Sequence, residues 1–104
     1  MSIEYTFYKQ GSTQMVSFES NAATSSTAFN SSCINHISVV ANTSINLLIT
    51  HSGSIVAVTT LGTGLGQPVN SNEAIIIPCV KAVGCSISGR VAAGTAWITE
   101  FLEA

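Results

Sequence analysis

The stretch that decides the fold runs from Ile34 to Thr59, INHISVVANTSINLLITHSGSIVAVTT. It contains no Asp, Glu, Lys or Arg, and two turn signals, Asn42–Thr43 and Ser52–Gly53, separate its β-branched runs. Apolar residues recur at every second position on both sides of the first turn, which is the period of a strand with one buried face. We therefore predict a meander of three short strands. The alternating apolar positions are Ile37, Val39 and Ala41 before the first turn and Ile45, Leu47 and Ile49 after it.

The chain before this meander predicts two strands and a polar segment. Residues 1–8 alternate apolar and polar side chains, and a second strand is expected over 13–19 after a turn at 10–12. Residues 20–32 are small and polar, which is typical of a surface loop or an irregular edge strand. The alternative for this segment is an extended arm that becomes ordered against a neighbouring subunit.

The chain after the meander begins with a glycine-rich segment, residues 61–72, which we interpret as a long flexible connection. Its G-x-G-x-G spacing is not that of a phosphate-binding loop. A strand is expected over 73–80, where three consecutive isoleucines predict that both faces of the strand meet apolar material. Pro78 has no backbone N–H to donate, which places this strand at a sheet edge or at a bulge.

Two further strands are predicted over 82–88 and 95–102. In the second, β-branched residues favour a strand over a short helix, although Trp97 and Phe101 are also spaced four apart. About eight short antiparallel strands without a long helix are typical of a β-sandwich or a small barrel. We predict an all-β, jelly-roll-like β-sandwich, with other Greek-key orders as alternatives. A length of 104 residues predicts one domain over residues 1–104.

The composition predicts a surface that other chains cover. Hydrophobic residues make up 46% of the chain and charged residues only 8%, against about 25% in an ordinary soluble domain. A surface with so few charges is poorly protected against association. We therefore expect self-association in a closed, symmetric oligomer.

The same composition argues against nucleic-acid and membrane partners. The net charge is −2, and the basic residues Lys9, Lys81 and Arg90 are too few to neutralise a phosphate backbone or an anionic lipid surface. No apolar run approaches the roughly 20 residues of a membrane-spanning helix. The first ten residues, MSIEYTFYKQ, lack the pattern of a signal peptide, so we expect folding in a reducing cytosol.

Neither a catalytic group nor a cofactor site is predicted. The chain has no Asp, and its histidines, His36 and His51, are interpreted as strand or turn residues rather than as catalytic bases. Cys33, Cys79 and Cys85 are expected to be structural, because the spacing of Cys33 and His36 and of the other two cysteines does not follow that of zinc sites. We therefore expect no catalytic residue, no metal ligand, no cofactor and no enzymatic activity.

The order of these features resembles that of small virion proteins of tailed phages. A Ser/Thr/Ala-rich lead-in, NAATSSTAFN, precedes two apolar strands separated by a polar turn, INHISVVANTSINLLITH. A glycine-rich loop then leads to an apolar strand with proline, GTGLGQPVNSNEAIIIPCV, and the last strand reads GTAWITEF. The resemblance covers residues 20–102. Within that group the chain is most similar to head decoration (cement) proteins.

This resemblance implies a structural role at the capsid surface of a virion assembled in the host cytoplasm. It implies a homotrimer whose partner is the major capsid protein. A tail or fibre-base component and a carbohydrate-binding β-sandwich for host recognition are the alternatives. Because terminal strands lie at sheet edges and aromatic side chains dominate interface energies, terminal residues are the candidates for subunit contacts. These candidates are Ile3, Tyr5, Phe7, Trp97 and Phe101.

Overall fold

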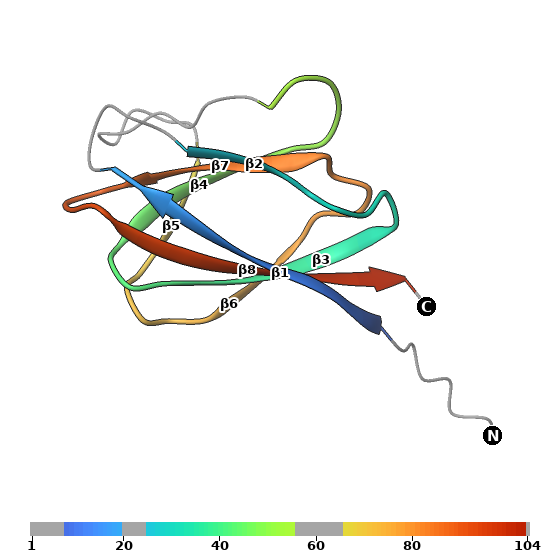
Figure 1. Cartoon of the computed structure of the whole chain (residues 1–104), viewed down its shortest axis with the longest axis horizontal. Helices are drawn as coiled ribbons and strands as arrows, with labels where there is room; N and C mark the ends of the chain where they lie inside the picture. The colour runs from blue at the N-terminus through green and yellow to red at the C-terminus, as the bar shows by residue number, and fades with distance from the viewer. Residues whose placement is uncertain (1–7, 20–24, 56–65, 104) are drawn as a thin grey trace.

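Figure 1 shows the chain as a computed structural model that describes residues 8–19, 25–55 and 66–103. Within these ranges the chain forms eight strands and no helix, which confirms the predicted all-β class. The strands are β1 (Tyr8–Phe18), β2 (Ser25–Ala28), β3 (Ile34–Ala41), β4 (Ile45–Thr50), β5 (Gln67–Val69), β6 (Ile75–Pro78), β7 (Gly84–Gly89) and β8 (Gly94–Glu103).

The strands build two antiparallel sheets that pack face to face as a β-sandwich. Sheet A has the order β1-β8-β3-β6, and sheet B has the order β2-β7-β4-β5. The pairs β1–β8, β2–β7, β3–β6 and β4–β5 are nested, as in one long hairpin that has been rolled up. This nesting is the jelly-roll arrangement predicted from the strand count. In Figure 1, β3, β6 and β8 lie below β2, β4 and β7, and β1 runs obliquely across the view from the lower right to the upper left.

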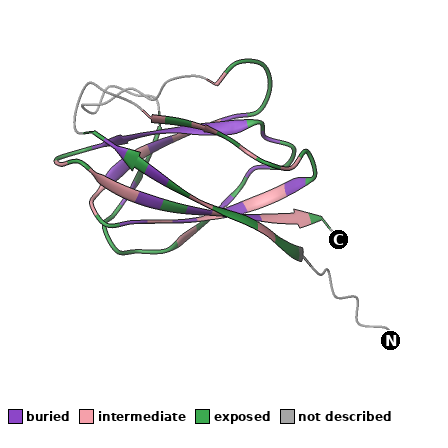
Figure 2. Ribbon diagram, viewed as in Figure 1, coloured by how far each residue is buried: buried purple, intermediate pink, exposed green. Residues whose placement is uncertain are grey.

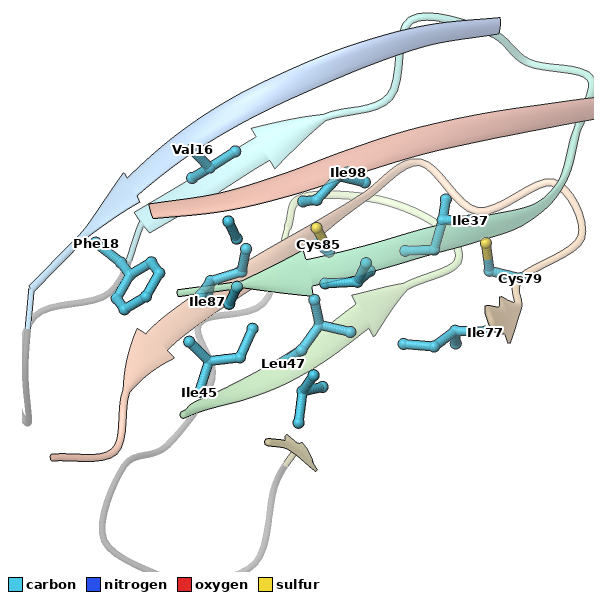
Figure 3. Packing of buried hydrophobic residues seen from close by; sticks show 14 of the residues in the cluster. Val16, Phe18, Ile37, Ile45, Leu47, Ile77, Cys79, Cys85, Ile87 and Ile98 are labelled. Carbon is cyan, nitrogen blue, oxygen red and sulfur yellow. The ribbon is translucent and has the colours of Figure 1, made fainter. Parts of the chain in front are cut away.

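The core fills the space between the two sheets with alternate residues from nearly every strand (Figure 3). Ile37 and Val39 of β3 and Ile98 of β8 point inward from sheet A, whereas Leu47 of β4 and Ile87 of β7 point inward from sheet B. All of these side chains are fully or almost fully buried. The period-two pattern of the sequence therefore identified the buried face of these strands correctly.

The predicted meander is wrong, because consecutive strands lie in opposite sheets. β3 and β4 belong to sheets A and B, and each pairs with strands far away in the sequence. Their alternating apolar residues face each other across the core instead of lying side by side. When the apolar faces of the two strands pack against one another, both are removed from water. In a single meander the same faces would lie side by side and need another layer to cover them. The third expected strand extends beyond Ile55 into residues outside the described ranges.

Two other strand boundaries differ from the prediction. The expected turn at 10–12 is a bulge within the single long strand β1, between Gln10 and Thr13. The expected loop over 61–72 contains the short strand β5. Val69 supplies the reason, because it is buried opposite Ile45 of β4 and closes the core at that edge.

The edge positions predicted from composition and from proline are confirmed. β2 falls within the small polar segment and forms one edge of sheet B, and β6 forms one edge of sheet A. The N–H of Cys79 donates to the carbonyl of Asn35 at 3.0 Å, so in this antiparallel ladder Ile77 faces β3 while Ile76 and Pro78 turn their backbone groups outward. The missing backbone N–H of Pro78 is therefore on the outer side of β6, where no neighbouring strand needs it as a donor.

One glycine is required by close packing at the end of β7. A Cβ on Gly89 would overlap the carbonyl oxygen of Ala92 and lie 3.0 Å from that of Glu19. Because these are backbone atoms, they cannot move aside without displacing the β7–β8 turn. The backbone of Gly89 also donates to the Glu19 carbonyl at 2.9 Å.

We therefore expect Gly89→Ala to lower the free energy of unfolding by about 1–3 kcal/mol, as overpacking does elsewhere. Urea unfolding followed by tryptophan fluorescence measures the change. Gly11→Ala is the matched control, because a Cβ at Gly11 would meet its nearest atoms at an ordinary 3.4 Å. Equal losses in the two variants would contradict the steric explanation.

Candidate interaction surface

The outer side of sheet A forms a regular grid of side chains that we call the open face. Strand register places Met15, Trp97 and Val40 opposite one another in a first row. A middle row and a third row follow at the next outward positions of the same strands. The middle row is Thr13, Thr99, Ser38 and Ile76. The third row is Gln10, Phe101, His36 and Pro78.

Large apolar side chains are exposed on the open face. The exposed fractions are 70% for Met15, 69% for Ile76 and 37% for Trp97. Because the three residues come from β1, β6 and β8, the apolar surface extends across the whole width of sheet A. Exposed apolar side chains gathered on one face mark interaction surfaces more often than single exposed ones do.

The three rows of the open face carry no formal charge, and the exposed charged residues of the described chain lie at the two ends of the sandwich. Depletion of charge is the compositional sign of the buried centre of a protein interface. At the end beside the third row, Lys81 bonds through its backbone to Ile34 at the start of β3. At the other end, Arg90 bonds through its backbone to Ser44 at the start of β4. The first end carries Lys9, Lys81 and Glu103, and the second carries Glu19, Glu73 and Arg90.

Contacts between neighbouring strands make the open face rigid. The rings of His36 and Phe101 stack with centroids 4.8 Å apart and an interplanar angle of 8°. The Nδ1 atom of His36 lies 2.9 Å from Oδ1 of Asn35. In the middle row, the hydroxyl groups of Thr13 and Thr99 share a hydrogen bond of 2.9 Å. These side chains are therefore held in place before any partner binds.

The outer side of sheet B differs from the open face. Ser86 and Ser88 of β7 and Thr50 of β4 turn away from the core, yet all three are buried. Figure 2 shows the corresponding continuous buried colour along β7. Between the two sheets, sheet A is thus the one that presents a broad exposed surface.

A buried carboxylate organises the polar side of the sandwich. Glu100 of β8 is 1% exposed and accepts hydrogen bonds from four donors. The backbone N–H groups of Asn30 and Ser31 donate at 2.9 and 3.2 Å, and the side chains of Ser12 and Gln14 donate at 3.3 and 3.4 Å. These four donors bury and anchor Glu100 close to the end of β8.

The same polar side chains connect the edges of the two sheets. The amide of Gln14 on β1 donates to the carbonyl of Ala28 on β2 at 2.9 Å, and the hydroxyl of Ser25 on β2 donates to the carbonyl of Ser17 on β1 at 2.7 Å. β1 and β2 are edge strands of different sheets and share no backbone ladder. Side-chain hydrogen bonds therefore close this edge of the sandwich, and Glu100 extends the network inward.

The three cysteines are free thiols. Cys79 and Cys85 are buried as expected, whereas Cys33 is exposed, which corrects the prediction for that residue. Burial raises the pKa of the Cys85 thiol to about 12, with a smaller contribution from Cys79. Burial also raises the pKa of Cys79 to about 11, assisted by the charge of Glu100. Within the described residues no group of three His, Cys, Asp or Glu side chains is placed to hold a metal ion.

The structure places two of the predicted contact residues together. Trp97 and Phe101 both lie on the open face, separated by Thr99 along β8. The edge position on which that prediction rested is wrong for them, because β8 lies between β1 and β3 inside sheet A. Ile3, Tyr5 and Phe7 lie outside the described residues. Sequence reasoning missed Met15 and predicted that Ile76 meets apolar material, but both side chains are exposed. Only strand register could have revealed their place on the open face.

Comparison with known proteins assigns neither a family nor a function to the chain. No protein family, curated protein or solved structure matches the chain. Across the described ranges, no helix is long and apolar enough to cross a membrane.

Proposed function

We propose that this chain is a structural subunit of a larger particle and acts by binding protein surfaces, without catalysis. The observation that carries the proposal is the open face, a rigid and uncharged surface with Met15, Ile76 and Trp97 exposed. Burying a fully exposed apolar side chain contributes roughly 1.5–3 kcal/mol, and the share left to these three residues scales with their exposed fractions. A monomer would leave this free energy unused.

The particle we propose is the capsid of a tailed phage, on which the chain is a decoration (cement) protein. The resemblance over residues 20–102 supports this placement, and the jelly-roll order supports it further, since that architecture recurs in viral capsid domains. A subunit without catalytic activity stabilises a particle when it binds the assembled lattice more tightly than it binds free capsid subunits. Repeated contacts with the major capsid protein multiply a modest affinity. A tail or fibre-base position is the alternative.

The stacked ring pair on the open face gives less support to the carbohydrate-binding alternative. A sugar stacks on an aromatic ring whose face is open to solvent. The rings of His36 and Phe101 instead turn their faces toward each other, across adjacent strands β3 and β8. The paired rings therefore suit packing against protein side chains better than sugar stacking.

Particles with and without this protein provide the test. We expect particles that carry it to retain their DNA to a higher temperature, because added contacts across capsid subunits must break before the shell opens. Binding should weaken little between low and high salt, since no charge lies on the open face. Purified protein added back to depleted particles is the control. Equal DNA retention without the protein, or its presence only on the tail, would contradict the capsid proposal.

A further inference from the structure

We infer that the open face binds the open face of a second copy of this chain, in a pair related by a twofold axis along the middle row of the grid. The inference goes beyond the proposed function and does not depend on which particle the chain joins. It concerns the free chain, in which the second copy covers the exposed apolar residues of sheet A until a particle surface takes its place.

The grid is self-complementary about this axis. A twofold axis along the middle row places the first row of one copy against the third row of the other. Trp97 then meets the paired rings of Phe101 and His36, because Trp97 and Phe101 lie on the same strand at equal distances from Thr99. On β3, Val40 meets His36 in the same way, and on β1 the apolar Met15 meets the uncharged Gln10. The pairing therefore buries no charge.

The middle row meets itself in the same arrangement. Thr13, Thr99 and Ser38 bring hydroxyl groups, each of which can both donate and accept, against the same groups of the partner copy. Ile76, also in this row, lies opposite its own counterpart. A row of hydroxyl groups tolerates this juxtaposition, whereas a row of like charges would not.

The charged ends agree with the same symmetry. The axis exchanges the two ends of the open face between the copies. Among the described residues, one end has two lysines and one glutamate, and the other has two glutamates and one arginine. The pair therefore brings a net positive end against a net negative end, whereas a parallel arrangement would bring like ends together.

The size of the open face sets the expected affinity. Four strands about 4.8 Å apart and outward rows about 6.6 Å apart give a face of roughly 20 by 20 Å. The accessible area exceeds this projection of about 400 Å² because side chains protrude, but it stays near or below the roughly 800 Å² per partner of a standard interface. We therefore expect dissociation in the micromolar range.

Substitutions at Ile76 test the pair with purified full-length protein. Sedimentation equilibrium at about 50 μM should give the mass of two chains for the wild type. Ile76→Glu and Ile76→Lys should each weaken association at least about thirtyfold, because each places two like charges opposite one another across the axis. An equimolar mixture of the two variants should restore the pair, since opposite charges then meet.

Val91→Glu is the matched control and should leave the pair intact. Val91 is 79% exposed, but it lies in the β7–β8 turn, away from the open face. Thermal unfolding of dilute samples confirms that each variant folds, which the 69% exposure of Ile76 favours. A monomeric wild type, undiminished association of Ile76→Glu, failure of the mixture to re-form the pair, or the mass of three chains would overturn the inference.

Discussion

Glu100→Gln is expected to lower the free energy of unfolding by about 2–4 kcal/mol. The glutamine has nearly the shape of the glutamate, so it creates no cavity. Its NH₂ group, however, replaces one of two accepting oxygens. Oε2 accepts from the backbone of Asn30 and from the side chains of Ser12 and Gln14, and Oε1 accepts from the backbone of Ser31. A buried donor then faces other donors, and the remaining hydrogen bonds lose the assistance of charge.

Urea unfolding at neutral pH measures this loss. Glu103→Gln is the matched control, because Glu103 lies three residues further along β8 and is exposed. That variant should have the same unfolding midpoint as the wild type. A loss below about 1 kcal/mol for Glu100→Gln would mean that the four hydrogen bonds contribute little, and that water replaces them readily.

Raising the pH from 9 to 12 is expected to remove several kcal/mol of stability through the buried thiols. Burial raises the pKa of Cys85 from 9.0 to about 12, and burial together with the nearby Glu100 raises that of Cys79 to about 11. Both thiols ionise at lower pH in the unfolded chain than in the folded one. Their contribution is therefore fully present below pH 9 and is lost as the pH rises through 11 and 12.

The size of the alkaline effect follows from the shift at Cys85. Each pKa unit corresponds to about 1.4 kcal/mol, so the three units at Cys85 represent roughly 4 kcal/mol by pH 12. The free energy of unfolding, measured by urea at several pH values, should decrease less steeply with pH for Cys85→Ala than for the wild type. Cys33→Ser, at the exposed cysteine, should follow the wild-type curve. Parallel curves for wild type and Cys85→Ala would contradict this assignment.

Local patterns predicted which face of β3 and of β4 is buried, but not the exposed face of β6 or which strands pair. The alternation predicted in β3 and β4 is correct, and the prediction of a strand over 95–102 places Trp97 and Phe101 on one face of β8. Alternation constrains only the direction of a side chain, whereas pairing depends on which distant apolar face completes the core. Consecutive strands were therefore predicted to be neighbours when they lie in opposite sheets.

The candidate surface was predictable only in part for the same reason. Trp97 and Phe101 stand out by residue type, but Met15 and Ile76 become part of the surface only through their register with β8 and β3. Glu100 did leave a local signal, because it shares the apolar phase of Ile98 and Leu102. Its donors come from residues about 70 to 90 positions earlier, which no local pattern specifies.

The nested strand order also constrains how the chain can fold during synthesis. β8 lies between β1 and β3 and hydrogen-bonds to both. Sheet A therefore lacks an inner strand, and β1 lacks its partner, until residues 94–103 have left the ribosome. Until then, β1 and β3 expose unpaired edges and apolar side chains to solvent. Contacts between such distant segments form slowly, because loop-closure entropy opposes them before any packing compensates. The nascent chain is therefore most exposed to aggregation, and most dependent on chaperones, just before its last described strand inserts.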